Sequence, residues 1–347
     1  MFQDIELLDL LKKQKEDSIC LVDVRSPQEF AEFRIPGSIN IPVFDNDERA
    51  EVGTIYKQVG PEAAKEKGLE IFSIKLPEFI AEFQSLEKEK MVYCWRGGMR
   101  SKTAATVVDL MGQQVSRLSG GIRSYRQWIV NKLEQQQFSP KMYVLNGYTG
   151  TGKTILLHRL KQQGYPVLDL EAMANHRGSI FGQIGLEPNN QKTFESLLVQ
   201  EMERYDQMPF VLLEGESKRI GKATLPLFLH DTKESSMQLF IHLPLEKRIE
   251  NILCEYNPEE HRAQVIEAFG RIQKHIHTPV AKQIGDDLEQ GNFQSAVALL
   301  LEYYYDPRYE HTLHYYPEDK QIHIYADDLD EALSSVLSFI EQEENIK

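Results

Sequence analysis

Two glycine-rich loops, each between a strand-like and a helix-like segment, constrain the fold of this chain more than any other feature. Residues 94–101, Cys-Trp-Arg-Gly-Gly-Met-Arg-Ser, follow the apolar residues 91–93. Residues 147–154, Gly-Tyr-Thr-Gly-Thr-Gly-Lys-Thr, follow the apolar residues 142–145. This arrangement directs backbone N–H groups and the positive end of a helix dipole at an anion. The sequence therefore predicts two anion-binding sites, only one of which has a thiol, and transfer of a group between a cysteine and a phosphorylated compound.

Length and composition predict a globular protein of two domains. The chain has 347 residues, of which 41% are hydrophobic and 27% charged, as in folded proteins with sizeable cores. No apolar run reaches the roughly 18–20 residues that a membrane span needs, and residues 1–6 do not resemble a signal peptide. Cys20, Cys94 and Cys254 lie far apart, which indicates a reducing cytoplasm and no disulfide framework or CxxC zinc site. The net charge of −14 argues against broad non-specific nucleic-acid binding but allows a local basic groove.

Strand and helix signals alternate along both halves of the chain, which predicts an α/β fold with parallel sheets. In the first half we expect strands near 19–24, 39–41, 91–93 and 115–118, and helices starting at Ser26, Ser101 and Ile122. Residues 44–90 are polar and helical in patches, and predict an insertion plus a surface helix. In the second half we expect strands near 142–146, 166–169, 210–213, 237–242 and 321–325, helices over most of 245–305, and a helix from 329 onward. A linker-like stretch at 135–140 divides the predicted domains, 1–137 and 138–347.

The first loop has the residue types of a reactive cysteine site. A thiolate at Cys94 would be stabilised by backbone donors and the helix dipole. Gly97 and Gly98 let the backbone curl so that N–H groups point inward, while Arg100 closes the loop and Arg96 adds positive charge. Such a thiol can attack sulfur, selenium or phosphorus, so we predict Cys94, Arg96 and Arg100 as catalytic residues. A buried structural cysteine is the alternative, which the coincidence of two glycines and two arginines at a strand–helix junction disfavours.

Residues 5–135 resemble the rhodanese family. The resemblance is carried by Asp23-Val24-Arg25-Ser26-Pro27-Gln28-Glu29-Phe30, Ile35-Pro36-Gly37-Ser38-Ile39-Asn40-Ile41-Pro42 and Leu118-Ser119-Gly120-Gly121-Ile122 with Trp128. The chain departs from the family at Phe33-Arg34, where many members have Gly-His, and its Cys-x5-Arg loop is one residue wider than the commoner form. The wider loop is similar to that of cysteine-dependent phosphatases with this fold, so it suits a tetrahedral phosphorus anion better than thiosulfate.

The second loop matches the phosphate-binding pattern Gly-x4-Gly-Lys-Thr. Its glycines permit close backbone approach, Lys153 reaches terminal phosphates and Thr154 can ligate Mg²⁺. The predicted phosphate-binding residues are Gly147, Thr149, Gly150, Thr151, Gly152, Lys153 and Thr154. This pattern indicates a site for a di- or triphosphate without proving nucleotide hydrolysis.

Carboxylates follow two strands of the same half. Residues 210–217 resemble a strand that ends in acidic residues, so Glu214 or Glu216 could orient a metal or water, with a solvated strand end as the equal alternative. Asp169, Glu171, His176, Arg177 and Ser179 follow another strand, where ligand loops usually lie. Their roles stay unassigned.

Basic residues near tyrosines predict contacts with RNA. The candidates are Arg123, Arg126, Lys218, Arg219, Lys274 and Arg308. Residues 303–309 add several tyrosines, and aromatic rings beside a basic groove suit an unstacked RNA base. Taken singly, each of these residues is better explained as a solvated helix face or a core tyrosine.

Taken together, the two halves resemble the tRNA 2-selenouridine synthase family. The resemblance is carried by residues 93–101, 147–154, 214–221 and 305–309. It implies that geranyl diphosphate alkylates the sulfur of a wobble 2-thiouridine in tRNA, and that selenium from selenophosphate then replaces the S-geranyl group. Lys153 and the second loop would stabilise the departing diphosphate. Cys94 would accept or deliver selenium, or attack selenophosphate, with Arg96 and Arg100 holding the phosphate.

The resemblance also implies the partners. We expect tRNA, a selenophosphate-supplying enzyme, a cytoplasmic location and no membrane; we expect no organic cofactor, with Mg²⁺ on Thr154 as the one metal considered. One alternative is an ATP-dependent kinase or NTPase with a rhodanese domain as sulfur carrier, which tRNA-independent ATP turnover would favour. Another is a binding module that docks a phosphorylated partner, which an unreactive Cys94 thiol would favour.

Overall fold

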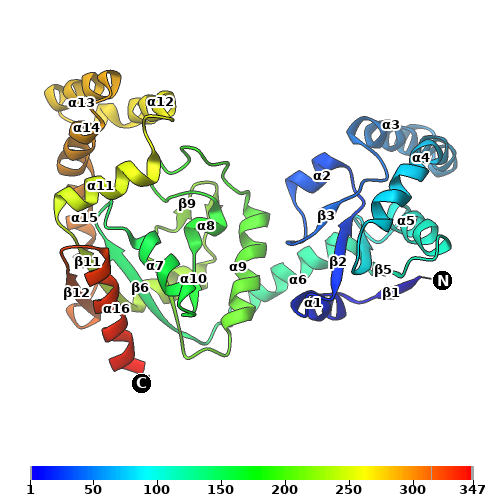
Figure 1. The fold of residues 1–347 in the computed structure, drawn as a ribbon, viewed down its shortest axis with the longest axis horizontal. Helices are drawn as coiled ribbons and strands as arrows, with labels where there is room; N and C mark the ends of the chain where they lie inside the picture. The colour runs from blue at the N-terminus through cyan, green and yellow to red at the C-terminus, as the bar shows by residue number, and fades with distance from the viewer. Residues whose placement is uncertain (1, 314, 345–347) are drawn as a thin grey trace. The chain divides into compact units, whose positions relative to one another are not determined.

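A computed structural model of the protein describes residues 2–313 and 315–344. The chain divides into two compact units, Met1–Gln135 and Gln136–Lys347 (Figure 1). Each unit is built around a five-stranded sheet whose paired strands are all parallel. This architecture confirms the predicted α/β class.

The sheet of the first unit has the strand order β1-β5-β4-β2-β3. Its strands are β1 (Gln3–Ile5), β2 (Ile19–Asp23), β3 (Ile39–Asn40), β4 (Glu89–Tyr93) and β5 (Val115–Leu118). Its helices are α1 (Leu7–Lys15), α2 (Pro27–Glu32), α3 (Asn46–Gln58), α4 (Pro61–Gln84), α5 (Met99–Leu110) and α6 (Gly121–Gln135). Cys94 therefore follows the central strand directly, as the sequence predicts. The short polar strand β1 was not predicted.

Residues 44–90 form two helices, where the sequence predicts an insertion and one surface helix; α3 is that surface helix, and the buried face of α4 is an addition to the prediction. No residue of α3 is buried, but α4 contributes Phe72, Phe79 and Phe83 to the core of the first unit, where they join Val22 and Val92. These phenylalanines lie on one face of the helix because their spacing is close to whole turns. The polar residues between them concealed that face in the sequence.

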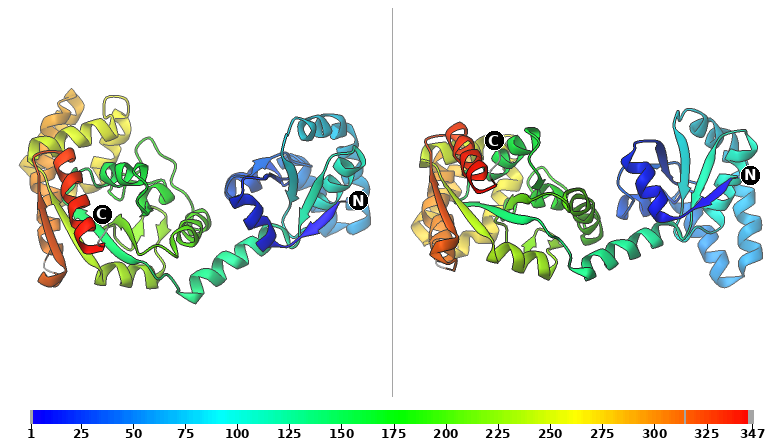
Figure 2. Two further views of the ribbon diagram at one scale, coloured as in Figure 1. Left: turned by 60° about the horizontal axis from the view of Figure 1, so that its bottom comes forward. Right: turned by 90° about the horizontal axis from the view of Figure 1, so that it is seen from below.

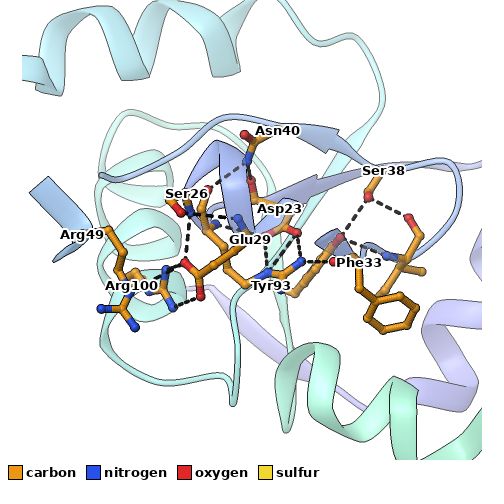
Figure 3. A network of polar contacts seen from close by, with 11 residues as sticks. Asp23, Ser26, Glu29, Phe33, Ser38, Asn40, Arg49, Tyr93 and Arg100 are labelled. Atoms are coloured by element: carbon orange, nitrogen blue, oxygen red, sulfur yellow. Dashed lines mark hydrogen bonds and ion pairs between the residues drawn. The ribbon is translucent and has the colours of Figure 1, made fainter. Parts of the chain in front are cut away.

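Buried polar contacts hold the start of α2 and the ends of β2 and β3 together (Figure 3). Ser26 accepts a hydrogen bond from Glu29 N while Glu29 accepts one from Ser26 N, which confirms the predicted helix start. Arg25 pairs with Asp23 at 2.6 Å, with both side chains almost fully buried, and also donates to the Phe33 carbonyl. The pair thus fixes the chain on both sides of α2.

The sheet of the second unit has the order β12-β11-β6-β8-β7. Its strands are β6 (Lys141–Gly147), β7 (Val167–Leu168), β8 (Phe210–Glu214), β11 (Met237–His242) and β12 (Gln321–Tyr325), and β9 (Arg219–Ile220) pairs with β10 (Ala223–Thr224) as a separate ribbon. Its helices include α7 (Lys153–Gln162), α8 (Leu170–Ala174), α9 (Gln191–Tyr205), α10 (Leu227–Ser235) and α16 (Leu329–Glu344). Figure 2 shows α16, in red, lying against this sheet, and it buries Val336 and Ile340 in the same core as Leu145 and Leu156.

A helical layer completes the second unit. It consists of α11 (Leu245–Tyr256), α12 (Arg262–Ile272), α13 (Thr278–Gln290), α14 (Phe293–Leu300), a π-helical turn (Leu301–Tyr305) and α15 (Asp306–Leu313) (Figure 1). Phe269, Ile284 and Phe293 belong to an apolar cluster of its own. No helix within the described part of the chain combines the length and apolarity that a membrane crossing requires.

We predict that Arg25→Met destabilises the first unit by about 3–5 kcal/mol, because it leaves the Asp23 carboxylate buried without its partner. Both tryptophans, Trp95 and Trp128, lie in this unit, so denaturant unfolding followed by tryptophan fluorescence measures the loss. Lys88→Met, which removes an exposed ion pair with Asp17, should cost less than about 1 kcal/mol. Equal losses in the two variants would contradict the structural role of the buried pair.

Candidate active site

The cysteine loop runs from the end of β4 to the start of α5. The Cys94 thiol is buried, and its Sγ lies 3.1 Å from the hydroxyl of Ser101. Gly97 has a φ of +67°, which residues other than glycine adopt at a cost. A Cβ at Gly97 would lie 3.1 Å from the carbonyl oxygen of Leu118. The loop therefore needs a glycine at this position, where its backbone passes the Leu118 carbonyl.

The start of α6 fixes the backbone of this loop. Ile122 N donates to the Cys94 carbonyl at 2.9 Å, and Arg123 N donates to the Trp95 carbonyl at 3.1 Å. Gly121, with a φ of +60°, makes this approach feasible, because a Cβ there would overlap the Cys94 carbonyl oxygen. The predicted closing motif of the first unit thus holds the cysteine loop in shape.

The two arginines of the loop differ in their surroundings. Arg100 donates to both carboxylate oxygens of Glu29, at 2.5 and 3.1 Å, and Arg49 lies 3.6 Å from the same carboxylate (Figure 3). Burial raises the pKa of Glu29, but the hydrogen bonds and charge of Arg100 outweigh it and leave that pKa below its ordinary value. Arg96 is exposed, and no described residue holds its side chain in a hydrogen bond or ion pair. Glu29 therefore orients Arg100, whereas Arg96 can turn toward an anion.

The phosphate loop connects β6 to α7. Gly147 has a φ of +149°, and a Cβ there would lie 2.7 Å from the carbonyl oxygen of Ile241 on the neighbouring strand. Gly152 is left-handed at the helix N-cap. Lys153 Nζ donates to the Gly147 carbonyl at 3.1 Å, so its ammonium lies across the loop. Thr151 is buried, and its hydroxyl donates to the Tyr148 carbonyl. These features form a cradle of backbone amides at a helix N-terminus.

Two side chains of α11 brace the outer backbone of this loop. Arg248 Nε donates to the Thr149 carbonyl at 2.9 Å, and Asn251 donates to the Gly150 carbonyl at 2.9 Å. Asp306 holds the Arg248 guanidinium with two hydrogen bonds of 2.6 and 2.9 Å. The sequence predicted no role for Arg248 or Asn251, since helical spacing of two polar residues is a common pattern. Their function emerges only when α11 packs against the loop.

Buried carboxyl groups lie next to the phosphate loop. The Thr154 hydroxyl donates to Glu171 at 2.8 Å. Burial, and after it the charge of Glu216, raises the pKa of Glu171 to about 8. Glu214 is fully buried and accepts from Leu170 N; burial and the nearby Asp169 raise its pKa well above the ordinary value. The acidic side chain that contacts the loop hydroxyl is Glu171, whose region the sequence indicated but whose role it left unassigned.

The side chain of Glu216, a predicted site residue, lies against the turn at Gly178. The two are so close that a Cβ on that glycine would overlap the Glu216 carboxylate. Within the described ranges, no three or more His, Cys, Asp or Glu side chains are placed to hold a metal ion. Thr154 and Glu171 do present two adjacent oxygen ligands of the kind that Mg²⁺ prefers. They would suit an Mg²⁺ ion that takes its other ligands from phosphate and water.

The predicted RNA-binding residues come from separate elements. Arg123 and Arg126 lie on α6, Lys218 and Arg219 at β9, Lys274 in the 3₁₀ turn Gln273–His275, and Arg308 on α15. Arg123, Lys218, Arg219, Lys274 and Arg308 are exposed, and Arg126 is half-buried. The Arg308 guanidinium lies 3.7 Å from the centre of the Tyr304 ring. Arg219 donates to the Gly221 carbonyl. The structure leaves most of these cations exposed, on several different elements.

Comparison with known proteins places both loops in recognised domains. A rhodanese-like domain matches residues 5–127, and the domain described as the tRNA 2-selenouridine synthase AAA domain matches residues 140–290. The tRNA 2-selenouridine synthase of Bdellovibrio bacteriovorus is 33% identical over 87% of this chain and 90% of its own. The chain belongs to the tRNA 2-selenouridine synthase family. A protein of the same name from Hydrogenovibrio crunogenus is 33% identical over 85% of this chain and 90% of its own.

Membership of the tRNA 2-selenouridine synthase family confirms the resemblance and the order of the two domains. The rhodanese-like match contains the cysteine loop, and the second match contains the phosphate loop together with Arg248 and Asn251. Asp306 lies beyond the second match, yet it holds Arg248 in place. The side chains that brace the predicted phosphate loop thus depend on a residue from outside the matched domain.

We predict that Glu171 makes the stability of the second unit fall as pH rises. An unfolded glutamate loses its proton near 4.5, whereas folded Glu171 keeps it to about 8. The folded state therefore binds more protons between these values, and the free energy of unfolding falls by up to about 1.4 kcal/mol per pH unit. Hydrogen exchange of β6 and β8, compared between wild type and Glu171→Gln at each pH, should show a weaker dependence in the variant. The exposed Glu250→Gln serves as control; identical wild-type and Glu171→Gln profiles would contradict the prediction.

We predict that Asp306→Ala weakens binding of inorganic diphosphate about tenfold, or about 1.4 kcal/mol. The substitution leaves Arg248 buried without its carboxylate and loosens the Thr149 carbonyl that Arg248 holds. Titration calorimetry measures the affinity. Asp330→Ala is the matched control, because Asp330 also pairs with an arginine, Arg159, but at the exposed surface. Unchanged affinity in Asp306→Ala would show that the brace does not shape the loop.

Proposed function

We propose that this chain converts the wobble 2-thiouridine of tRNA to 2-selenouridine in two reactions, one at each loop. The observation that carries the proposal is the pairing of a buried thiol in a glycine-rich loop with a second glycine-rich loop braced by Arg248, in a chain of the tRNA 2-selenouridine synthase family. The thiol supplies a nucleophile that the phosphate loop lacks. The phosphate loop supplies a lysine and a hydroxyl suited to a diphosphate.

The first reaction is geranylation at the phosphate loop. The thiocarbonyl sulfur attacks C1 of geranyl diphosphate, the C–O bond breaks, diphosphate leaves, and the uridine N3 proton is released. Lys153, the loop amides and the helix dipole would stabilise the negative charge that develops on the leaving diphosphate. Thr154 and Glu171 would hold Mg²⁺, which when bound neutralises part of the diphosphate charge. The pKa of Glu171 implies that such an ion displaces a proton at neutral pH.

An apolar cavity beside this loop favours a prenyl diphosphate over a nucleotide. It has a volume of about 60 Å³ and reaches Thr149, with Phe181, Ile252, Val265 and Phe293 among its walls. A cavity of that volume takes in only a few water-sized groups, so it would hold one part of a ten-carbon chain. A nucleobase would lose hydrogen bonds with water there and find few partners. A hydrocarbon chain loses none.

The second reaction is selenium transfer at the cysteine loop. The Cys94 sulfur attacks the phosphorus of selenophosphate, the P–Se bond breaks, and the released hydrogen selenide attacks C2 of the S-geranyl uridine. Geranylthiolate leaves and takes up a proton, N3 is reprotonated, and water hydrolyses the phosphocysteine to phosphate. Selenium stays at the same oxidation level throughout, so no reductant is needed. Arg96, Arg100 and the loop amides would hold the phosphoryl oxygens, and Ser101 can donate to the sulfur when it departs.

The substrate implies the setting of the enzyme. A wobble base reacts at C2 only when it is unstacked from the anticodon loop. The exposed cations Arg123, Lys218 and Lys274 are candidates for contacts with the RNA backbone. We place the reaction in the cytoplasm, with a selenophosphate-supplying enzyme as a second partner.

Paired substitutions separate the two reactions. With 2-thiouridine tRNA and geranyl diphosphate, Lys153→Ala should reduce geranylation by about 10²–10³-fold yet still convert tRNA that was geranylated beforehand. Cys94→Ser should geranylate normally but form no 2-selenouridine when selenophosphate is added. Mass spectrometry of the tRNA nucleosides measures both products.

Matched controls lie in the same unit as the phosphate loop. Lys161→Ala removes an exposed lysine of the same helix, α7, and Cys254→Ser removes an exposed cysteine; both should behave as wild type. Formation of 2-selenouridine by Cys94→Ser would refute the proposed nucleophile. Normal geranylation by Lys153→Ala, or rapid ATP turnover without tRNA, would instead favour a kinase or NTPase.

A further inference from the structure

The first unit contains a large apolar cavity that the two proposed reactions do not use. It has a volume of about 800 Å³ and lies among α3, α4 and the first turn of α5. Val52 and Tyr56 line it from α3, Ala64 and Leu69 from α4, and Met99 from α5. A hollow of this size and composition is of the kind that binds small apolar groups.

Small residues keep this cavity open. Ala50 and Gly53 line it from α3, and Ala64 and Gly68 line it from α4, where larger side chains would fill the space between two packed helices. A Cβ at Gly68 would lie 3.1 Å from the Phe44 ring. The cavity therefore results from several small residues on both helices and not from a single small side chain.

Apolar side chains around the cavity are exposed to solvent. Tyr56, Leu69 and Met99 are 60%, 69% and 59% exposed, and all three line the cavity. Exposed apolar side chains around one cavity commonly mark a binding site. An occupant with an apolar part would bury these side chains.

The cavity and the cysteine loop share residues. Met99 and Arg100 line the cavity, and Arg100 is also the arginine that closes the loop begun by Cys94. Arg49, another lining residue, approaches the Glu29 carboxylate that holds Arg100 (Figure 3). The wall nearest the loop thus carries two cations that share the Glu29 carboxylate, while the walls along α3 and α4 are mostly apolar and include the cations Lys57 and Lys65.

We propose that this cavity binds the hydrocarbon chain of the S-alkylated uridine while its C2 atom is at the cysteine loop. The inference rests on the proposed function and adds to it the residues that recognise the intermediate. The product of the first reaction differs from unmodified 2-thiouridine only by an apolar chain. A loop that binds anions makes no contact that distinguishes the two bases, whereas an adjoining apolar cavity can bind the chain. The same cavity can also bind the geranylthiol that leaves, which is poorly soluble in water.

Substitution at the cavity mouth tests this assignment. Leu69→Glu places a charge among the lining residues, and Ile74→Glu is its matched control, because Ile74 lies on the same helix, is 80% exposed and does not line the cavity. Both positions face solvent, so both variants should fold. With tRNA already carrying S-geranyl-2-thiouridine, Leu69→Glu should raise KM for selenium transfer at least tenfold with little change in kcat, and Ile74→Glu should match wild type.

A second substrate and a binding measurement make the outcome decisive. With S-methyl-2-thiouridine tRNA, Leu69→Glu should match wild type, because a methyl group does not reach the cavity. Fluorescence anisotropy gives the affinity of each variant for both RNAs without any reaction. Equal affinities and KM values of Leu69→Glu and Ile74→Glu for the S-geranyl RNA, or equal losses for both RNAs, would overturn the cavity assignment. If wild type binds the S-geranyl RNA through Leu69 but never forms 2-selenouridine, the proposed reaction fails while the cavity assignment stands.

Discussion

Both predicted anion sites depend on backbone segments that approach each other more closely than any Cβ would allow. At the cysteine loop, Gly121 lets the start of α6 reach the Cys94 carbonyl. At the phosphate loop, Gly147 lies against the carbonyl of Ile241 on the next strand. Each contact lets a strand end turn sharply into its loop, which is the backbone shape that an inward-facing set of N–H groups requires. Without these glycines the loops would open, and the reactive side chains would have no anion to act on.

Ion pairs from other elements then orient each loop. Glu29, fixed by its own capping box, orients Arg100, and Asp306 orients Arg248, which in turn holds the Thr149 carbonyl. In both arrangements a buried or half-buried carboxylate pairs with the cation, and this pairing offsets part of the free-energy cost of removing the cation from water. Asp306 therefore contributes to the same predicted site although it lies far along the chain from the phosphate loop. A domain that ended at residue 290 would lack Asp306, so Arg248 would lose the carboxylate that holds it against the loop.

The features predicted from sequence are those with short-range causes. Ser26, Pro27 and Glu29 specify a helix start among neighbours, and both loops were recognisable because strand, glycines and helix are contiguous. The burial of α4 was not predicted, since polar residues between Phe72, Phe79 and Phe83 masked its face. The Thr154–Glu171 and Arg248–Thr149 contacts join segments separated by 17 and 99 positions, and only the packed sheet brings them together. The cavity lined by Leu69 has no sequence signature, because it arises where small residues of two helices face each other.

Each anion loop adjoins an apolar cavity, and this combination bears on how an acidic chain can act on RNA. Proteins that bind nucleic acid through phosphate contacts draw their affinity from many cations and lose it steeply as salt rises. This chain has a net charge of −14, and its exposed cations are dispersed over several elements. If an alkyl chain supplies part of the affinity by burial, fewer phosphate contacts are required, and that part is insensitive to salt. In that case geranylation would activate C2 for substitution and would also give the base an apolar group that an acidic protein can bind.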